Sequence, residues 1–225
     1  MKKTFYLFLL SLLISTPAFA GGDASSATVK IYKAYMSTSG DCSSPVVFLD
    51  AENDPTDFPN GYAAVDFIKN PTIGSGSIAD GAYKCVIFKM SDRLTFVSAY
   101  SDGDQCVDGT TYTVDLCNTS SQNAETGATV ACSDNTDDAV WVYFSTYSAF
   151  VETGSCEDCN TFVPPASNGD AKHALKLDNE VTLSSDIIGT LVFGTAGKVV
   201  TESMTEGGFR CGLQPPDMSF RVTAQ

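Results

Sequence analysis

The chain has little with which to carry out acid–base or nucleophilic catalysis. Histidine occurs once among the 225 residues, as His173. A Ser-His-Asp or Cys-His arrangement would have to use that residue, and no G-x-S-x-G motif is present. The sequence therefore predicts a protein that is not an enzyme. The alternative is a hydrolase that uses His173 or a pair of acidic residues, of which the chain has many.

Positive charge is also scarce. Lysine and arginine together number 13 against 27 aspartates and glutamates, which gives a formal net charge of −14. Such a field repels phosphate backbones and anionic lipid headgroups. We therefore expect no nucleic-acid partner and no direct binding to a membrane surface.

Long apolar runs are absent except at the start of the chain. Lys2 and Lys3 precede an apolar stretch from Phe5 to Ile14, and the small-x-small pattern Ala18-Phe19-Ala20 follows it. This order is typical of a bacterial secretory signal peptide, and the stretch is too short to span a bilayer. The sequence predicts a cleaved signal over residues 1–20 and one domain over 21–225. The mature chain is then periplasmic, surface-bound or extracellular, with no membrane insertion.

Helical periodicity is hard to find, whereas β-branched and aromatic residues cluster in short runs between Gly, Asn, Asp, Ser and Pro. This rhythm is typical of an all-β domain. In the first run, Val29, Ile31 and Tyr35 are expected to share one side of a strand. The expected strands cover residues 28–36, 45–49, 63–68, 73–78, 82–90, 93–100, 111–117, 140–150, 174–183, 189–194, 198–201, 209–213 and 218–222.

Cysteine is plentiful: eight residues, all after the predicted signal, which favours disulfides formed in an oxidising compartment. Their pairing does not follow from the sequence. The acidic residues inside Cys156-Glu157-Asp158-Cys159 favour a structural over a redox role. Five cysteines fall in 101–170, which we expect to be a Cys-rich, loop-rich insertion. The eight are Cys42, Cys85, Cys106, Cys117, Cys132, Cys156, Cys159 and Cys211.

An acidic loop is the strongest candidate for a metal site. Asp50, Glu52, Asp54 and Asp57 supply carboxylate oxygens of the kind that calcium prefers. The same residue types are common in solvated turns, because they make local backbone hydrogen bonds. The sequence predicts no cofactor, with calcium bound at this loop in a calcium-stabilised structural protein as the alternative.

One strand candidate carries most of the aromatic residues. Trp141, Tyr143 and Tyr147 have one parity, and Val140, Val142 and Phe144 have the other. If the aliphatic side is core, the Trp/Tyr side is an exposed platform for a ligand such as a glycan. The alternative is that both sides are buried between sheets.

A resemblance rests on the hydrophobic pattern of two stretches. The first contains Val65-Asp66-Phe67-Ile68, Gly74-Ser75-Gly76, the turn Asp80-Gly81 with Tyr83, and then Val86-Ile87-Phe88. The second contains Thr190 to Gly194 and Cys211 to Pro216. Together they resemble uncharacterised secreted bacterial domains with a prealbumin-like, immunoglobulin-like sandwich. In that motif Gly81 is expected to turn the chain with a positive φ.

The resemblance implies an immunoglobulin-like or prealbumin-like antiparallel β-sandwich and brings no catalytic residues. Together with the residue-level reading, it predicts a secreted, disulfide-stabilised, non-enzymatic protein of the bacterial envelope or exterior. A binding, adhesion or structural role is expected, with a glycan or a surface protein as partner.

Overall fold

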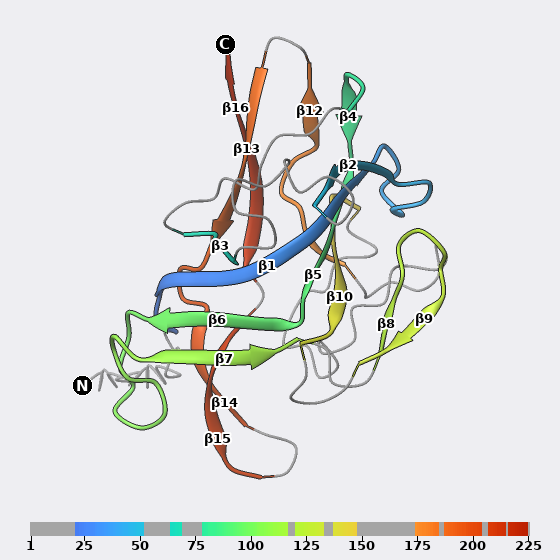
Figure 1. Ribbon diagram of the computed structural model, residues 1–225. Helices are drawn as coiled ribbons and strands as arrows, with labels where there is room; N and C mark the ends of the chain where they lie inside the picture. The colour runs from blue at the N-terminus through green and yellow to red at the C-terminus, as the bar shows by residue number, and fades with distance from the viewer. Residues whose placement is uncertain are drawn as a thin grey trace, which may run out of the picture.

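The computed structural model describes residues 21–51, 64–68, 78–116, 120–132, 137–147, 174–184, 187–203, 207–214 and 216–224. Within these ranges the chain is all-β, as the sequence predicts, and it contains no helix (Figure 1). The predicted signal, residues 1–20, lies outside them. In the part of the chain that is described, no helix has the length and apolarity needed to cross a membrane.

The largest sheet has eight strands and is mixed. Its order is β11-β10-β5-β1-β6-β7, and β2 and β3 pair with the other edge of β1. All these pairs are antiparallel except β10 with β11. The strands are β1 (Ala24–Ser37), β2 (Val46–Asp50), β3 (Ala64–Asp66), β5 (Cys85–Ser91), β6 (Arg93–Ser98), β7 (Thr111–Asp115), β10 (Ala139–Ser145) and β11 (Leu175–Lys176).

The sheet curls because its central strands bend. The N-terminal half of β1 pairs with β6 and its C-terminal half pairs with β5, while Asp92 alone separates those two partners. Figure 1 shows β1 running beside β6 and then turning to follow β5. One half of the sheet is therefore β10-β5-β1, and the other is β1-β6-β7.

A β-bulge in β1 overturns the predicted alternation. The pairing of β1 with β5 shifts between Ile31 and Lys33. Val29 and Ile31 lie in one core cluster, but Tyr35 lies in another, on the opposite side of the sheet. The expectation that these three residues share a side is wrong, because an extra residue in a bulge reverses the side-chain parity beyond it.

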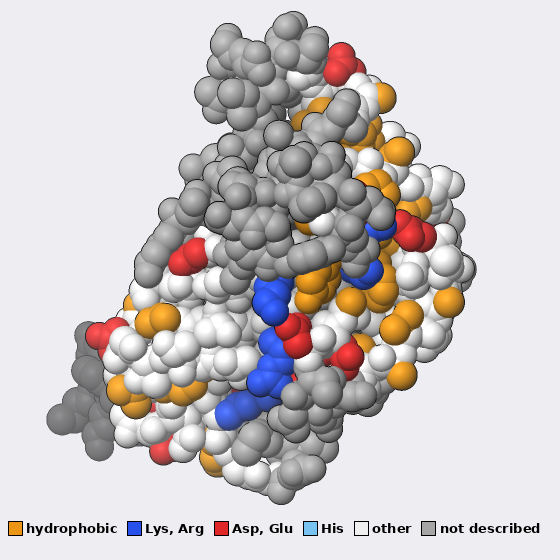
Figure 2. Space-filling model, in the orientation of Figure 1, with side chains coloured by type: hydrophobic (Ala, Val, Ile, Leu, Met, Phe, Trp, Pro, Cys, Tyr) orange, Lys and Arg blue, Asp and Glu red, His pale blue; other side chains and the backbone are white. Residues whose placement is uncertain are grey.

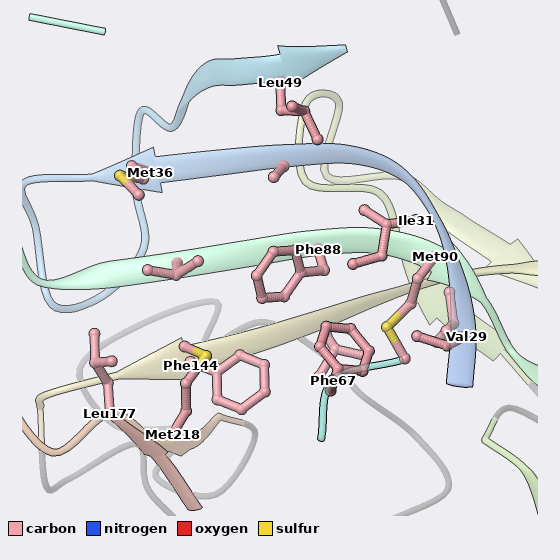
Figure 3. Close-up of a cluster of buried hydrophobic side chains, with 14 of the residues drawn as sticks. Val29, Ile31, Met36, Leu49, Phe67, Phe88, Met90, Phe144, Leu177 and Met218 are labelled. Atoms are coloured by element: carbon pink, nitrogen blue, oxygen red, sulfur yellow. The ribbon is translucent and has the colours of Figure 1, made fainter. Parts of the chain in front are cut away.

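The first side of the β10-β5-β1 half, the apolar face, forms the main core. It is built from Val86, Phe88 and Met90 of β5 and from the aliphatic side of β10, including Phe144. Phe193 is partly buried and packs against this core, with its ring centroid 6.0 Å from that of Phe144 and 6.3 Å from that of Phe88. Figure 3 shows Phe88, Phe144 and Met218 directed toward one another in this core.

Four two-stranded pieces complete the fold. The ribbon β13–β16 carries Phe193 and Met218 and covers the apolar face. The hairpin β14–β15 packs through Val199 and Cys211 on the β6–β7 half, beside Phe96. The pieces are β4 (Gly81–Tyr83) with β12 (Val181–Leu183), β8 (Ser120–Gln122) with β9 (Thr129–Ala131), β13 (Ile187–Gly194) with β16 (Asp217–Ala224), and β14 (Val199–Ser203) with β15 (Phe209–Leu213).

Disulfides pin loops and hairpins to the sheet. Cys42 is bonded to Cys85 across 43 residues, and Cys106 to Cys211 across 105. Cys132 is also disulfide-bonded. By the chain-entropy argument, loops of these two sizes correspond to about 4 and about 5 kcal/mol of stabilisation, respectively. These bonds suggest an oxidising, extracytoplasmic environment for the folded chain.

Most predicted strands are present in the described residues, with some differences. The expected strand 174–183 is divided into β11 and β12, and the expected strand 73–78 lies outside the described residues except for Ile78. The expected strand 82–90 is divided at Lys84 into β4 and β5. Gly81 begins β4 opposite Leu183 and has no positive φ, so its predicted turn role is wrong. The hairpin β8–β9 was not predicted. Of the expected insertion 101–170, the described residues supply this hairpin and also β7 and β10 of the main sheet.

The start of the described chain is docked tightly. The Gly22 amide donates to the Val199 carbonyl at 2.8 Å, and the Val199 amide donates to the Gly22 carbonyl at 2.9 Å. A Cβ on Gly22 would lie 1.9 Å from Cβ of Tyr100, so glycine is required by this close approach. The residues just after the predicted cleavage position are therefore part of the packed fold.

Candidate functional site

The second side of the β10-β5-β1 half carries an unusual mixture of lysine and aromatic residues. Lys33 of β1 is opposite Lys89 of β5, which is opposite Trp141 of β10. In the next row Tyr35 is opposite Ile87, which is opposite Tyr143. Directly opposed residues on one side of an antiparallel sheet touch, so the two rows form one surface. We call Lys33, Tyr35, Lys89, Trp141 and Tyr143 the aromatic–lysine face.

This face is covered rather than open. Trp141 is 4 % exposed and Tyr143 is 1 % exposed, whereas Tyr147, at the end of the same run, is 42 % exposed. The expectation of an exposed Trp/Tyr platform is therefore wrong for Trp141 and Tyr143. The alternative holds for them, because other elements pack over this side of β10.

Among the described residues, a loop and a hairpin provide most of the cover, and Ala174, just before β11, is buried in the same cluster. The loop after β1 brings Cys42 onto Cys85, and Ser145 Oγ donates to the Gly40 carbonyl at 2.6 Å. The hairpin β8–β9 packs Ala124 and Val130 against the aromatic residues. Its buried Ser121 accepts the Trp141 amide hydrogen at 3.2 Å through Oγ. The hairpin thereby also satisfies a backbone donor at the outer edge of β10.

Charged groups link the hairpin to the sheet. Lys33 Nζ is 3.2 Å from Oδ2 of Asp50 and 3.6 Å from Oε1 of Glu125, which belongs to the hairpin loop. The Tyr35 hydroxyl donates to the same Glu125 oxygen at 3.2 Å. The Lys33 side chain is itself buried, and these two carboxylates compensate its charge.

The aromatic members have their own electrostatic environment. Lys89 Nζ lies 5.4 Å from the Trp141 ring centroid, within the range of a cation–π contact. Burial raises the pKa of the Tyr143 hydroxyl far above its usual range. The indole Nε1 of Trp141 is buried and finds no acceptor among the described residues. An indole N–H without an acceptor is unfavourable in a core that serves only for packing.

The predicted calcium loop meets this face at one residue. Asp50 is bound to Lys33, and Glu52, Asp54 and Asp57 lie outside the described residues. Among the residues described, no group of three or more His, Cys, Asp or Glu side chains is arranged to hold a metal ion. The structure thus places Asp50 beside Lys33, which is separated from Trp141 by Lys89 in the same row. His173 lies outside the described ranges.

A second polar cluster lies where β5 becomes β6. Asp92 is 0 % exposed; Oδ1 accepts the Asp138 amide hydrogen at 3.0 Å, and Oδ2 has no partner among the described residues. The Asp92 carbonyl accepts the Leu116 amide hydrogen at 2.8 Å. Burial raises the pKa of Asp92 to about 6, and the nearby carboxylates of Asp115, Asp138 and Asp137 also raise it.

Residues around this bend are ion-paired at the surface. Lys30 Nζ is 2.7 Å from Oδ2 of Asp137, and Arg93 lies 3.9 Å from Asp115. The hydrogen bond from Lys30 lowers the pKa of Asp137, and the same contact raises the pKa of Lys30. The Asp92 bend joins the two halves of the sheet, so its arrangement is accounted for by the fold.

In the space-filling view, Lys and Arg side chains form a column on one face, with Asp and Glu side chains beside them (Figure 2).

Three residues of this site, Lys33, Lys89 and Glu125, were not predicted from the sequence. Lys89 had an available signal, because it interrupts the apolar run from Cys85 to Met90 at the parity of Ile87. Lys33 had none, since the bulge in β1 decides its side, and Glu125 lies in a hairpin that was not predicted.

Comparisons of the chain with family models, with curated proteins and with solved structures return no match. The aromatic–lysine face therefore has to be interpreted from its own geometry and chemistry.

Proposed function

We propose that the chain is an exported, disulfide-stabilised, non-enzymatic module that binds a glycan at the aromatic–lysine face. The observation that carries this proposal is the row of Lys33, Lys89 and Trp141 across three neighbouring strands. Aromatic rings present an apolar surface with a polar edge, and lysines and an indole N–H donate hydrogen bonds to hydroxyl or carboxylate oxygens.

Stability alone is a poor reason for these residue types. The apolar face of the same strands is filled with aliphatic and Phe side chains. On the other side, the chain buries Lys33 and leaves the Trp141 indole without an acceptor. Asp50 and Glu125 compensate the charge of Lys33, but the indole donor has no such compensation among the described residues. Positions that depart from the packing rules are where function is expected.

We also propose that the chain is exported and that its fold is an immunoglobulin-like or prealbumin-like sandwich. Export rests on the signal pattern over residues 1–20 and is supported by the disulfides, which persist in oxidising compartments. An immunoglobulin-like or prealbumin-like sandwich is supported by the position of the β13–β16 ribbon, whose Phe193 and Met218 pack on the apolar face as a second layer would.

The test is binding of residues 21–225, produced with disulfides intact, to an immobilised panel of glycans, followed by calorimetric titration with each glycan retained. We expect Trp141→Phe to weaken binding about 10-fold or more, because it removes the indole donor and part of the ring surface. Phe209→Ala is the matched control, since Phe209 is an exposed aromatic on β15 and lies outside this face.

Circular dichroism and thermal melting check that both variants are folded. The proposal is overturned if no glycan is retained, or if Trp141→Phe and Phe209→Ala bind the retained glycan as tightly as the unaltered chain.

A further inference from the structure

The hairpin β8–β9 is attached to the molecule differently from the other added pieces. Its strands, like those of the other two-stranded pieces, pair only with each other within the described residues, so the difference lies in the side-chain contacts. The ribbon β13–β16 buries Met218 in the main core and packs Phe193 against it, and β14–β15 is joined to the loop between β6 and β7 by Cys106–Cys211. Toward the aromatic–lysine face, the described contacts of β8–β9 are the partly buried Ala124 and Val130 and the polar groups of Ser121 and Glu125. At the end of β9, Cys132 is disulfide-bonded and lies in the main core, so the loop end of the hairpin is the part held by replaceable contacts.

The hairpin loop is built to present Glu125. The side-chain oxygen of Asn123 accepts the amide hydrogens of Glu125 at 2.8 Å and Thr126 at 3.0 Å, and Gly127 adopts a positive φ of 66°. An asparagine that hydrogen-bonds the following amides, with a glycine in the left-handed region, fixes a tight loop. The Glu125 backbone is therefore held in place by the loop itself, independently of the contacts of its side chain with the sheet.

The Glu125 carboxylate is the connection most easily replaced. One of its oxygens receives both the Lys33 contact at 3.6 Å and the Tyr35 hydrogen bond at 3.2 Å. Its side chain is 45 % exposed, and ion pairs this accessible contribute little to stability. A carboxylate from another molecule offers Lys33 and Tyr35 the same two contacts.

Beneath the hairpin lie groups suited to a sugar. They are the Trp141 ring, whose indole N–H has no acceptor among the described residues, Lys89 beside that ring, and Lys33 opposite Lys89. Asp50 is the acidic group paired to Lys33 from the sheet itself. The chain as a whole has a charge of −14, which disfavours a long polyanion but not a single carboxylate.

We propose that β8–β9 is a lid over the aromatic–lysine face, and that the ligand is a glycan with one acidic sugar whose carboxylate displaces that of Glu125 from Lys33 and Tyr35. This inference rests on the proposed function, because it specifies the class of glycan bound at the aromatic–lysine face and the element that covers that face. The sugar ring would then lie on Trp141, with the indole N–H as a donor to it.

The experiment compares two disaccharides that differ in one carboxylate, cellobiouronic acid and cellobiose, by calorimetric titration. The acid should bind the unaltered chain more tightly than the neutral sugar. Glu125→Gln keeps the shape of the side chain and removes its charge, so the lid opens more easily and both sugars should bind about 3- to 10-fold more tightly. Lys33→Gln should abolish the preference for the acid.

Glu180→Gln is the matched control, because Glu180 forms a similarly exposed ion pair with Lys84 at 3.8 Å on another part of the surface. It should change neither affinity. The lid also has a readout without ligand. Trp141 is the single tryptophan, so acrylamide quenching of the intrinsic fluorescence reports on its cover alone. Quenching should increase in Glu125→Gln and stay unchanged in Glu180→Gln.

The outcomes separate this inference from the proposed function. If acrylamide quenching is unchanged in Glu125→Gln, the proposal of a lid is overturned, regardless of the affinities measured for the two sugars. An acid preference that persists in Lys33→Gln overturns the assigned ligand class. If other glycans bind through Trp141 while the acidic sugar has no advantage, the proposed function stands and this inference fails.

Discussion

The two sides of the β10-β5-β1 sheet are covered in different ways, although they are made by the same strands. The apolar face packs on Phe193 and Met218, and the described residues of its core cluster are hydrophobic. The hairpin over the aromatic–lysine face reaches it through the partly buried Ala124 and Val130 and through the polar groups of Ser121 and Glu125. This face keeps a buried lysine and an indole N–H that has no acceptor among the described residues. The first cover contributes to the main core. In our proposal, the second is held by contacts that a ligand can replace.

The largest effect should come from the apolar face. Phe88 is 1 % exposed and lies next to Phe144 and Phe193. We expect Phe88→Ala to lower the free energy of unfolding by about 4 kcal/mol, because it removes buried surface and leaves a cavity. Val130→Ala, in the hairpin over the other face, should cost less than about 1 kcal/mol. Denaturant unfolding of the two variants measures both values.

Equal losses in Phe88→Ala and Val130→Ala would remove the contrast between the two faces, since they would make the hairpin as much a part of the core as β13–β16.

The Asp92 bend should give an intermediate effect that depends on pH. Its folded pKa of about 6 lies above the ordinary value of 3.8, so the folded state binds the proton more tightly than the unfolded state. The stability that this group contributes is present below about pH 4 and is lost as the pH rises through 6. Asp92→Asn keeps an oxygen to accept the Asp138 amide hydrogen and removes the buried charge.

We therefore expect Asp92→Asn to raise the free energy of unfolding by about 2 kcal/mol at pH 7.5 and to give no gain near pH 4. Exposed Asp108→Asn is the control and should show no such difference between the two pH values. A loss of stability in Asp92→Asn at pH 7.5 would mean that the buried carboxylate is ionised and satisfied there. An ionised Asp92 carboxylate would then stabilise the bend that joins the two halves of the sheet.

Much of this contrast was predictable from the sequence, and the rest was not, for identifiable reasons. The alternation of Val140, Val142 and Phe144 with Trp141 and Tyr143 correctly assigns the two sides of β10. It does not say what covers the second side, because that cover is a hairpin of polar residues with no hydrophobic pattern. The side occupied by Lys33 depends on a bulge, which shifts parity without a marker in the residue types.

Other features depend on contacts distant in sequence. The pairing of Cys106 with Cys211 is a tertiary fact that spacing does not encode. Asp50 is part of a run of acidic residues that indicates calcium, yet it binds Lys33, which lies opposite it in the pairing of β1 with β2. Local composition suggested a metal ligand, whereas strand register supplied an ion-pair partner.

The most direct test of the central claim is hydrogen exchange in the unaltered chain at neutral pH, followed by mass spectrometry. The account predicts that ladder amides of the β8–β9 hairpin, which covers the aromatic–lysine face, exchange about 100-fold or more faster than those of β13–β16 over the apolar face. Equal protection of the two ladders, with both exchanging only on global unfolding, would contradict it.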